Sequence, residues 1–190
     1  MSSLSPRHEQ VITLDASLRP TGAMDKLDAH QGAGHLHLAF SVLLRARDGR
    51  VLLQRRAEGK HHFAGDWANT CCSHPRPGET IRAAATRRLG EELGLADAPE
   101  LTPWAAFTYE ARDERSGLIE VEYDVVLTGI LAADHPLDHA PSEVAELAWM
   151  DGAAIEALLH DDTQRVAPWL VPVLGAAAGP REPVAATVAL

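Results

Sequence analysis

The segment ETIRAAATRRLGEELG, at residues 79–94, has the strongest helical pattern in the chain. A loop containing two prolines and a glycine, HPRPGE, leads into it, and the pattern stops at Gly94, as helices often do at glycine. The segments on both sides alternate like strands, so the sequence predicts an α+β domain whose mixed sheet packs on this central helix. Its apolar face consists of Ile81, Ala84, Ala85, Leu89 and Leu93.

The remaining elements follow from alternation and turn residues. A turn is expected at RPTG (19–22), a β-hairpin around Asp48-Gly49, and a second strand pair joined by RDERSG (112–117). Two helices are expected near the end, at 152–160 and at 164–177, the second interrupted by Pro168 and Pro172. We expect one domain over 1–178 and a disordered tail over 179–190. The expected strands are 9–15, 35–46, 51–56, 67–73, 104–111, 118–131 and 144–151.

Bulk composition limits the classes of function. A chain of 190 residues with 46% hydrophobic residues can bury one sizeable core. Its net charge of -10 argues against non-specific nucleic-acid binding, which needs clustered cations. No apolar run resembles a signal peptide or a membrane span, so we expect a cytoplasmic protein without a membrane partner.

Both cysteines of the chain, Cys71 and Cys72, are adjacent in the stretch NTCCSHP. Neighbouring cysteines rarely bridge each other, because a disulfide needs a Cα separation and geometry that one peptide link strains. Metal ligation, acid–base or nucleophilic chemistry and core packing remain open for them. On a strand, alternation would turn Cys72 and His74 to one face and leave Cys71, a small buried hydrophobe, on the other.

A metal site is one reading of the histidine and carboxylate pattern. Six of the ten histidines fall between positions 30 and 74. In LIEVEYDVV, alternation places Glu120, Glu122 and Asp124 on one strand face, where they repel one another unless that face is wet or meets a cation. An exposed strand face is the alternative. Imidazole nitrogen together with carboxylate oxygen suits Mg²⁺, Mn²⁺ or Zn²⁺.

The helix and the loop before it resemble the Nudix box, a loop–helix–loop whose carboxylates hold a divalent cation against a diphosphate. Ser73 replaces the opening glycine of that motif, and Arg88 replaces a glutamate that is a main metal ligand in hydrolases. An Arg88–Glu92 ion pair one turn apart is the plain interpretation of these two residues. A cation at position 88 also suits a protein that holds a diphosphate without cleaving it. The matching residues are Glu79, Arg87, Glu91, Glu92 and Gly94.

A second and more specific likeness covers roughly residues 10–175. The stretches KLDAH, HLHLAFS, RRAEGK, WANTCCSHP and EVEYDVV, in this order, are similar to type I isopentenyl diphosphate isomerases of the Nudix superfamily. The resemblance implies a Nudix-like mixed sheet flanked by helices, with extra N-terminal strands and C-terminal helices. It also implies isomerisation of isopentenyl diphosphate to dimethylallyl diphosphate, through a tertiary carbocation, in isoprenoid precursor biosynthesis. The implied metal ligands are His30, His37, His74, Glu120 and Glu122, with His35 facing solvent.

The same resemblance assigns the remaining roles. It implies that Cys72 and Glu122 handle protons and that Tyr109 helps to position or polarise their path. A Mg²⁺ bound with the substrate diphosphate would use Glu92. Trp67 and Trp169 could steady a cation through their ring faces, and core packing is the alternative for both. The implied diphosphate ligands are Lys26, Arg56, Lys60 and Arg88, a set that contains both lysines of the chain.

Two other functions stay open at this point. A Nudix hydrolase of a nucleoside or prenyl diphosphate would share the box, and a catalytically silent metal-binding or interaction protein could share the scaffold. Every proposed ligand and proton carrier is present in the chain, which favours the isomerase. A small-molecule prenyl diphosphate is the expected partner, and the expected oligomeric state is a monomer or weak homodimer.

Overall fold

The computed structural model describes residues 9–95, 97–181 and 184. This part of the chain forms an α+β domain with a mixed sheet, as predicted, and none of its helices is long and apolar enough to cross a membrane. The elements are β1 (Gln10–Leu14), β2 (Pro20–Asp25), α1 (Lys26–Ala29), β3 (His37–Arg45), β4 (Val51–Arg56), β5 (Trp67–Ala68), β6 (Cys71–Ser73), α2 (Ile81–Leu93), β7 (Thr102–Arg112), β8 (Ile119–Ile130), β9 (Val144–Met150), α3 (Gly152–Leu159) and α4 (Leu170–Ala178).

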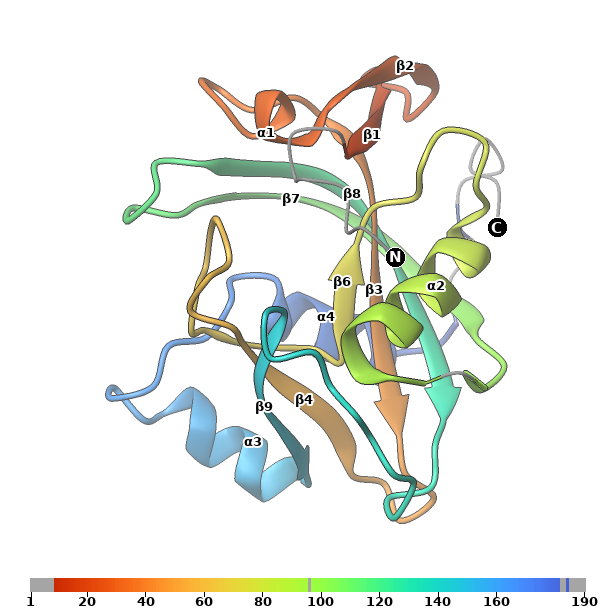
Figure 1. Ribbon diagram of the computed structural model, residues 1–190, viewed down its shortest axis with the longest axis vertical. Coiled ribbons are helices and arrows are strands. Elements are labelled where there is room, and N and C mark those ends of the chain that lie inside the picture. Colours follow the sequence, from red (N-terminus) through yellow and green to blue (C-terminus); the bar gives the residue numbers. More distant parts are fainter. Residues whose placement is uncertain (1–8, 96, 182–183, 185–190) are drawn as a thin grey trace.

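Strand β3 lies at the centre of the sheet (Figure 1). It pairs in parallel with β8 along its whole length and antiparallel with β1 and β6. On the far side of β8, the long strand β7 completes a curved antiparallel hairpin, while β4 carries β5 and β9. The central strand therefore joins every part of the sheet, and side chains from β3, β6, β7 and β8 can meet on one of its faces.

Alternation along the central strands creates two apolar layers. On one face, Phe40 and Val42 of β3 pack with Leu89 of α2; on the other, Leu43 packs with the α4 side. Figure 1 shows α2 and α4 on opposite sides of β3. Burial of a leucine of this kind stabilises the fold by about 1.5–3 kcal/mol. The sheet is thus held rigidly between helices, which fixes the side chains that point from it.

Helix α2 has the ends that the sequence predicts. The Thr80 hydroxyl caps the N-terminus by accepting a hydrogen bond from the amide of Ala83 at 3.2 Å. At the other end Gly94 adopts the left-handed conformation, with φ 68°, and its amide bonds back to the carbonyl of Gly90.

The N-terminal turn lies before RPTG rather than within it. Asp15 forms the turn, because its carboxylate accepts hydrogen bonds from the amides of Ser17 and Arg19. Pro20 then begins β2, an edge strand on which a missing backbone donor can be tolerated. The predicted turn at 19–22 is therefore wrong, and α1, capped by Asp25, follows directly.

The turn at Asp48-Gly49 is present, but the hairpin it was expected to close opens at once. Only Arg45 and Val51 are paired between β3 and β4, after which each strand takes other partners. Thr70 bridges the gap: its hydroxyl accepts from the Leu44 amide at 2.9 Å and donates to the Leu52 carbonyl at 2.5 Å. This residue also divides the strand expected over 67–73 into β5 and β6.

The C-terminal helix begins later than predicted. Pro168 precedes α4, and Pro172 lies in its first turn, where a helix needs no amide donor. Of the tail expected over 179–190, Gly179 accepts a hydrogen bond from the indole of Trp104 and Arg181 donates to the Pro103 carbonyl. Residues 182–183 and 185–190 lie outside the described part, so the prediction of disorder there stays a prediction.

Candidate active site

Five residues from four segments of the chain meet on the β8 face that carries the carboxylates. Each offers one nitrogen or oxygen atom, and these atoms all lie within 4.8 Å of one another. All five side chains are buried, so the exposed-face interpretation of the β8 acids is wrong. Parallel pairing of β3 with β8 sets His37 directly beside Glu122, while His30 follows α1 and His74 follows β6. The group is the one predicted: His30, His37, His74, Glu120 and Glu122.

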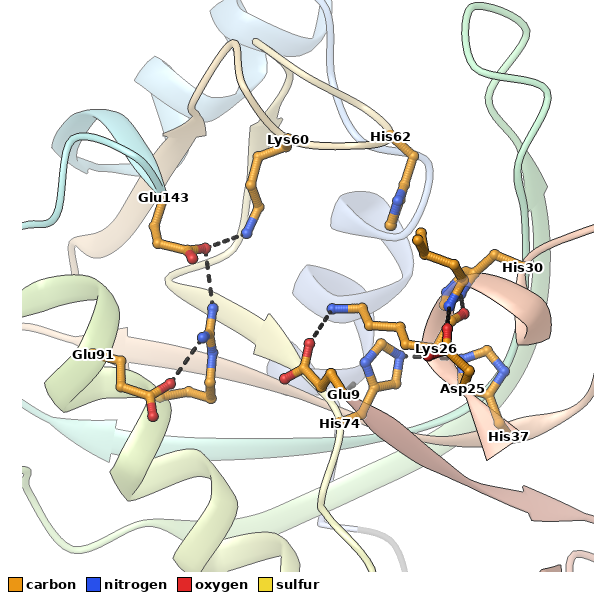
Figure 2. A network of polar contacts seen from close by, with 12 residues as sticks. Glu9, Asp25, Lys26, His30, His37, Lys60, His62, His74, Glu91 and Glu143 are labelled. Atoms are coloured by element: carbon orange, nitrogen blue, oxygen red, sulfur yellow. Dashed lines mark hydrogen bonds and ion pairs between the residues drawn. The ribbon is translucent and has the colours of Figure 1, made fainter. Parts of the chain in front are cut away.

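The three histidines of the group lie close together in Figure 2. The Nε2 atoms of His37 and His74 are 3.1 Å apart, and Oε1 of Glu122 lies 2.8 Å from the latter and 3.3 Å from the former. Close by, Nε2 of His30 is 3.4 Å from Oε2 of Glu120. Such a concentration of buried nitrogen and oxygen atoms is what a divalent cation requires.

The protonation of two imidazoles supports this reading. Nδ1 of His30 is 2.5 Å from the Lys26 carbonyl, and Nδ1 of His37 is 2.6 Å from the His35 carbonyl. A carbonyl only accepts, so each Nδ1 carries a proton and each Nε2 is directed to the centre. Burial lowers the pKa of His37 to about 4 and that of His74 well below its usual value, which keeps both rings neutral. This donor set fits a divalent cation.

The two glutamates differ in their affinity for protons. Burial, together with the adjacent charge of Glu120, raises the pKa of Glu122 well above its usual value. Burial opposes the ionisation of Glu120 as well, but the charge of His62 and hydrogen bonds from its neighbours lower its pKa well below the usual value. Two carboxyl groups whose pKa values are shifted in opposite directions can take different roles, Glu122 as an acid and Glu120 as a permanent carboxylate.

Tyr109, Glu122 and His37 form one row of paired residues across strands β7, β8 and β3. Tyr109 lies opposite Glu122 in the β7–β8 pairing, and its hydroxyl donates to Oε2 of Glu122 at 2.6 Å. Burial and the neighbouring glutamates raise the pKa of Tyr109 well above its usual value. The phenol therefore remains a neutral donor that fixes the direction of the carboxyl group.

Cys71 and Cys72 face opposite sides of the sheet, as alternation predicts. Cys71 is fully buried in the α2 layer, whereas Cys72 packs on the layer that contains Trp169. Burial raises the pKa of Cys72 to about 11, although the charge of Arg56 opposes this, so its thiol is neutral. Cys72 pairs with Ser41 of β3, and Glu122 pairs with His37 of the same strand. The two rows are therefore four residues apart along β3, about 13 Å at roughly 3.3 Å per residue.

The third acid of β8, Asp124, lies between these two rows. It accepts a hydrogen bond from the Ser41 hydroxyl at 2.7 Å, and burial raises its pKa to about 7. Its Oδ1 atom has no hydrogen-bond partner in the described part of the chain, and it is not one of the five converging residues. Asp124 and Ser41 thus form a polar floor between Cys72 and Glu122.

Three of the four predicted diphosphate ligands, Lys26, Lys60 and Arg88, form ion pairs with carboxylates of the chain. Glu143 accepts hydrogen bonds from both Lys60 and Arg88, the latter at 3.1 Å. Figure 2 shows Lys60 turned toward Glu143 and Lys26 turned toward Glu9, where an ion pair of 3.0 Å forms. Glu143 was missed by the sequence analysis, since it stands in a loop without periodicity.

Arg56 is held differently from the other cations. Its guanidinium donates to the carbonyls of His62 and Phe63, approaches Cys72 Sγ at 3.8 Å, and lies 5.5 Å from the ring centroid of Trp169. Trp169 is in turn 6.1 Å from the ring of Tyr109, so it borders the site.

Two further predicted residues, Glu92 and Trp67, lie outside the five-residue group. Glu92, on α2, pairs with Arg88 and accepts from the Gln54 amide at 3.2 Å. Trp67 packs in the α4 layer and donates to Gln164. The ion pair between Arg88 and Glu92 is therefore present, whatever further role the two have.

One histidine at the site was not singled out from the sequence. His62 is 9% exposed, and its Nε2 lies 2.5 Å from Oε1 of Glu120. Its ring stacks on that of His30 at 5.1 Å between centroids. The concentration of histidines between 30 and 74 included it, but the adjacent His61 is exposed, and nothing in the sequence separates the two.

Comparison with known proteins agrees with this geometry. The NUDIX domain family matches residues 35–170. An isopentenyl-diphosphate Delta-isomerase of Halorhodospira halophila is 44% identical over 161 residues, covering 85% of this chain and 90% of that protein. A protein of the same name from Nocardia farcinica is 47% identical over 165 residues, covering 86% and 91%.

Solved structures share the fold at low sequence identity. The crystal structure of DR0079 from Deinococcus radiodurans has a TM-score of 0.71 at 17% identity and covers 88% of this chain and 99% of its own. The NUDIX domain of Shewanella oneidensis NrtR, complexed with ADP ribose, has a TM-score of 0.56 at 18% identity, covering 74% and 85%.

Proposed function

The chain belongs to the isopentenyl-diphosphate Delta-isomerase family of NUDIX-domain proteins, and from that premise we propose that it interconverts isopentenyl and dimethylallyl diphosphate. The reaction moves a double bond by adding a proton to one carbon and removing a proton from another. An unactivated alkene is a very weak base, so the site needs a well-placed acid and must keep water from the carbocation.

Two groups supply and accept these protons. Glu122 is the stronger candidate for the acid, because burial and the adjacent Glu120 raise its pKa and the Tyr109 hydroxyl fixes its direction. Cys72, a neutral thiol on the same face, stands at the other end of the polar floor and handles the second proton. Their separation leaves room for a flat five-carbon unit between them.

The five-residue group holds a divalent cation, for which Mg²⁺, Mn²⁺ and Zn²⁺ are the candidates. When bound, the cation fixes the orientation of Glu122 and tunes its acidity. A buried site of three imidazoles and two carboxylates is costly to assemble unless it binds such an ion. Mg²⁺ accompanying the diphosphate would use Glu92.

The diphosphate is bound by Lys26, Lys60 and Arg88, and also by Arg56. Each of the first three pairs with a carboxylate of this chain, and an anionic substrate can replace such a partner. Arg88 stands where a hydrolase of this fold would place a metal-binding glutamate. Charge of this sign retains the diphosphate without helping to activate water against it.

Trp169 bounds the space next to Tyr109 and Phe63, with ring centroids 6.1 and 5.0 Å away. An aromatic face there excludes water and can stabilise a cation by up to about 2 kcal/mol. Trp67 packs in the α4 layer and donates to Gln164, which favours the core-packing alternative for it.

The observation that carries the proposal is the row Tyr109–Glu122–His37, in which one carboxyl group contacts a proton donor and a metal ligand. The test is to incubate the protein with isopentenyl diphosphate and Mg²⁺ and to analyse the products. Dimethylallyl diphosphate without released phosphate supports the isomerase. Phosphate or diphosphate release, undiminished in Cys72→Ala, would favour the Nudix hydrolase instead.

A further inference from the structure

His62 is a buried imidazole that the proposed reaction does not use, although it contacts a proposed metal ligand. The carboxylate of Glu120 is shared between two partners: Oε2 faces Nε2 of His30, and Oε1 faces Nε2 of His62 at 2.5 Å. His62 itself is absent from the group of converging ligand atoms. One oxygen of Glu120 is thus directed to the centre, and the other is held from outside.

The loop that carries His62 is fixed on both sides. Arg56 donates to the carbonyls of His62 and Phe63, at 3.0 and 3.1 Å. From the other side, Asp113, in the turn between β7 and β8, accepts a hydrogen bond from the Phe63 amide at 2.9 Å. Charged partners of this kind make strong hydrogen bonds, so the position of His62 is closely determined.

Phe63 also adopts a strained backbone conformation. Its φ is 49°, in the left-handed region that residues with a side chain rarely occupy. Its ring is buried against Trp169 and lies 5.8 Å from the ring of His62. Strain of this sort persists where the surroundings impose it, and the adjacent His62 is buried while His61 remains exposed. In Figure 2, His62 points from its loop toward His30.

We propose that His62 is a positioning residue for the metal site: it holds Oε1 of Glu120 so that this carboxylate presents a single oxygen, Oε2, to the cation. The inference rests on the metal site of the proposed function and adds an outer residue to it. Residues that orient metal ligands in this way typically contribute about 10- to 100-fold to metal affinity.

The experiment measures Co²⁺ binding by titrating metal-free protein and following its visible absorption. His62→Leu keeps apolar bulk against His30 but lacks the donor, so its dissociation constant should rise about 10- to 100-fold. His62→Gln restores an N–H at a similar reach and should recover most of the affinity. His61→Leu, at the exposed neighbouring position, is the matched control and should bind like the parent protein. Far-UV circular dichroism checks that each variant is folded, and His62→Ala replaces His62→Leu if the latter is not.

X-ray absorption of the Co²⁺ forms separates positioning from ligation. The number of nitrogen ligands should be the same in the parent protein and in the folded His62 variants. Unchanged affinity in His62→Leu, or the loss of one nitrogen ligand, would overturn the inference while leaving the metal site intact. Failure of the parent protein to bind Co²⁺ would overturn the metal site as well.

Discussion

Cys71 and Cys72 differ only in which side of β6 they face, and this decides what each can do. Cys72 lies on the face shared with the β8 carboxylates, near Arg56 and the layer that contains Trp169. Cys71 lies in the α2 layer, fully buried, where burial raises the pKa of its thiol well above the usual value. Of the two cysteines, only Cys72 can reach a substrate.

Replacing each cysteine separately tests this assignment. Cys72→Ala should lower kcat by about 10²- to 10⁴-fold, the range expected when a general acid or base is removed. Cys71→Ala should keep its kcat and lose on the order of 1 kcal/mol of unfolding free energy, because it removes one buried sulfur. Steady-state kinetics and urea unfolding measure the two effects. Equal loss of activity in both variants would show that the face assignment is incorrect.

The site residues that could be predicted are those with a sequence pattern. Glu120 and Glu122 share a face by strand alternation, and the histidines were placed by their likeness to a family motif. His62 and Glu143 could not be found, because each acts through a loop whose path is set by distant contacts. For the loop that carries His62, these contacts are made by Arg56 and Asp113, and neither strand nor helix periodicity predicts them.

At the scale of elements, the C-terminus of α2 determines how the helix meets the loop beyond it. Gly94 has φ 68°, and a Cβ atom built there would lie 2.7 Å from the Asp138 carbonyl oxygen. The chain closes tightly at this point, since the Asp138 amide also donates to the Leu93 carbonyl. Glycine is therefore required for both conformation and space.

Gly94→Ala should lower the free energy of unfolding by on the order of 1–3 kcal/mol, from backbone strain and the clash together. Gly175→Ala is the control, because this glycine lies within α4 and a Cβ there meets nothing within 4 Å. Alanine in a helix should stabilise by about 0.5–1 kcal/mol. Chemical denaturation measures both, and a Gly94→Ala protein as stable as the parent would contradict this view of the cap.

Elements with strong periodicity were predictable, whereas their pairing was not. Helix α2 and strands β7, β8 and β9 lie where the pattern places them. The β3–β4 hairpin is shorter than predicted, because a turn signal predicts a reversal of the chain but not the number of residues that then pair. Here β8 competes for β3 and offers nine paired residues against one, and Thr70 fills the resulting gap.

For the whole molecule, Glu143 links two cations that we propose bind the diphosphate to the stability of the fold. It lies between Lys60 on one side and Arg88 on α2 on the other. Burial would raise the pKa of Glu143, but these two cations outweigh it and lower the pKa from 4.5 to about 2. A lowered folded pKa stabilises the protein above the unfolded value, and this contribution disappears as the pH falls from about 4.5 toward 2.

Glu143→Gln should therefore be less stable than the parent protein at pH 7, by on the order of 1–2 kcal/mol after solvent screening. The difference should shrink as the pH is lowered from about 5 toward 2. Glu146→Gln is the control: its pair with Arg55 is exposed, and its effect should stay within about 0.5 kcal/mol. Thermal unfolding from pH 7 to pH 3 measures these differences. A constant difference for Glu143→Gln would show that its charge contributes nothing to folding.

The central claim is that this protein moves a proton onto and off a five-carbon diphosphate. Its most direct test is incubation of the metal-loaded protein with isopentenyl diphosphate in deuterated water, followed by mass spectrometry of the products. The proposed chemistry predicts dimethylallyl diphosphate carrying solvent deuterium, and almost none of it with Cys72→Ala. Unlabelled substrate together with released phosphate would contradict the claim.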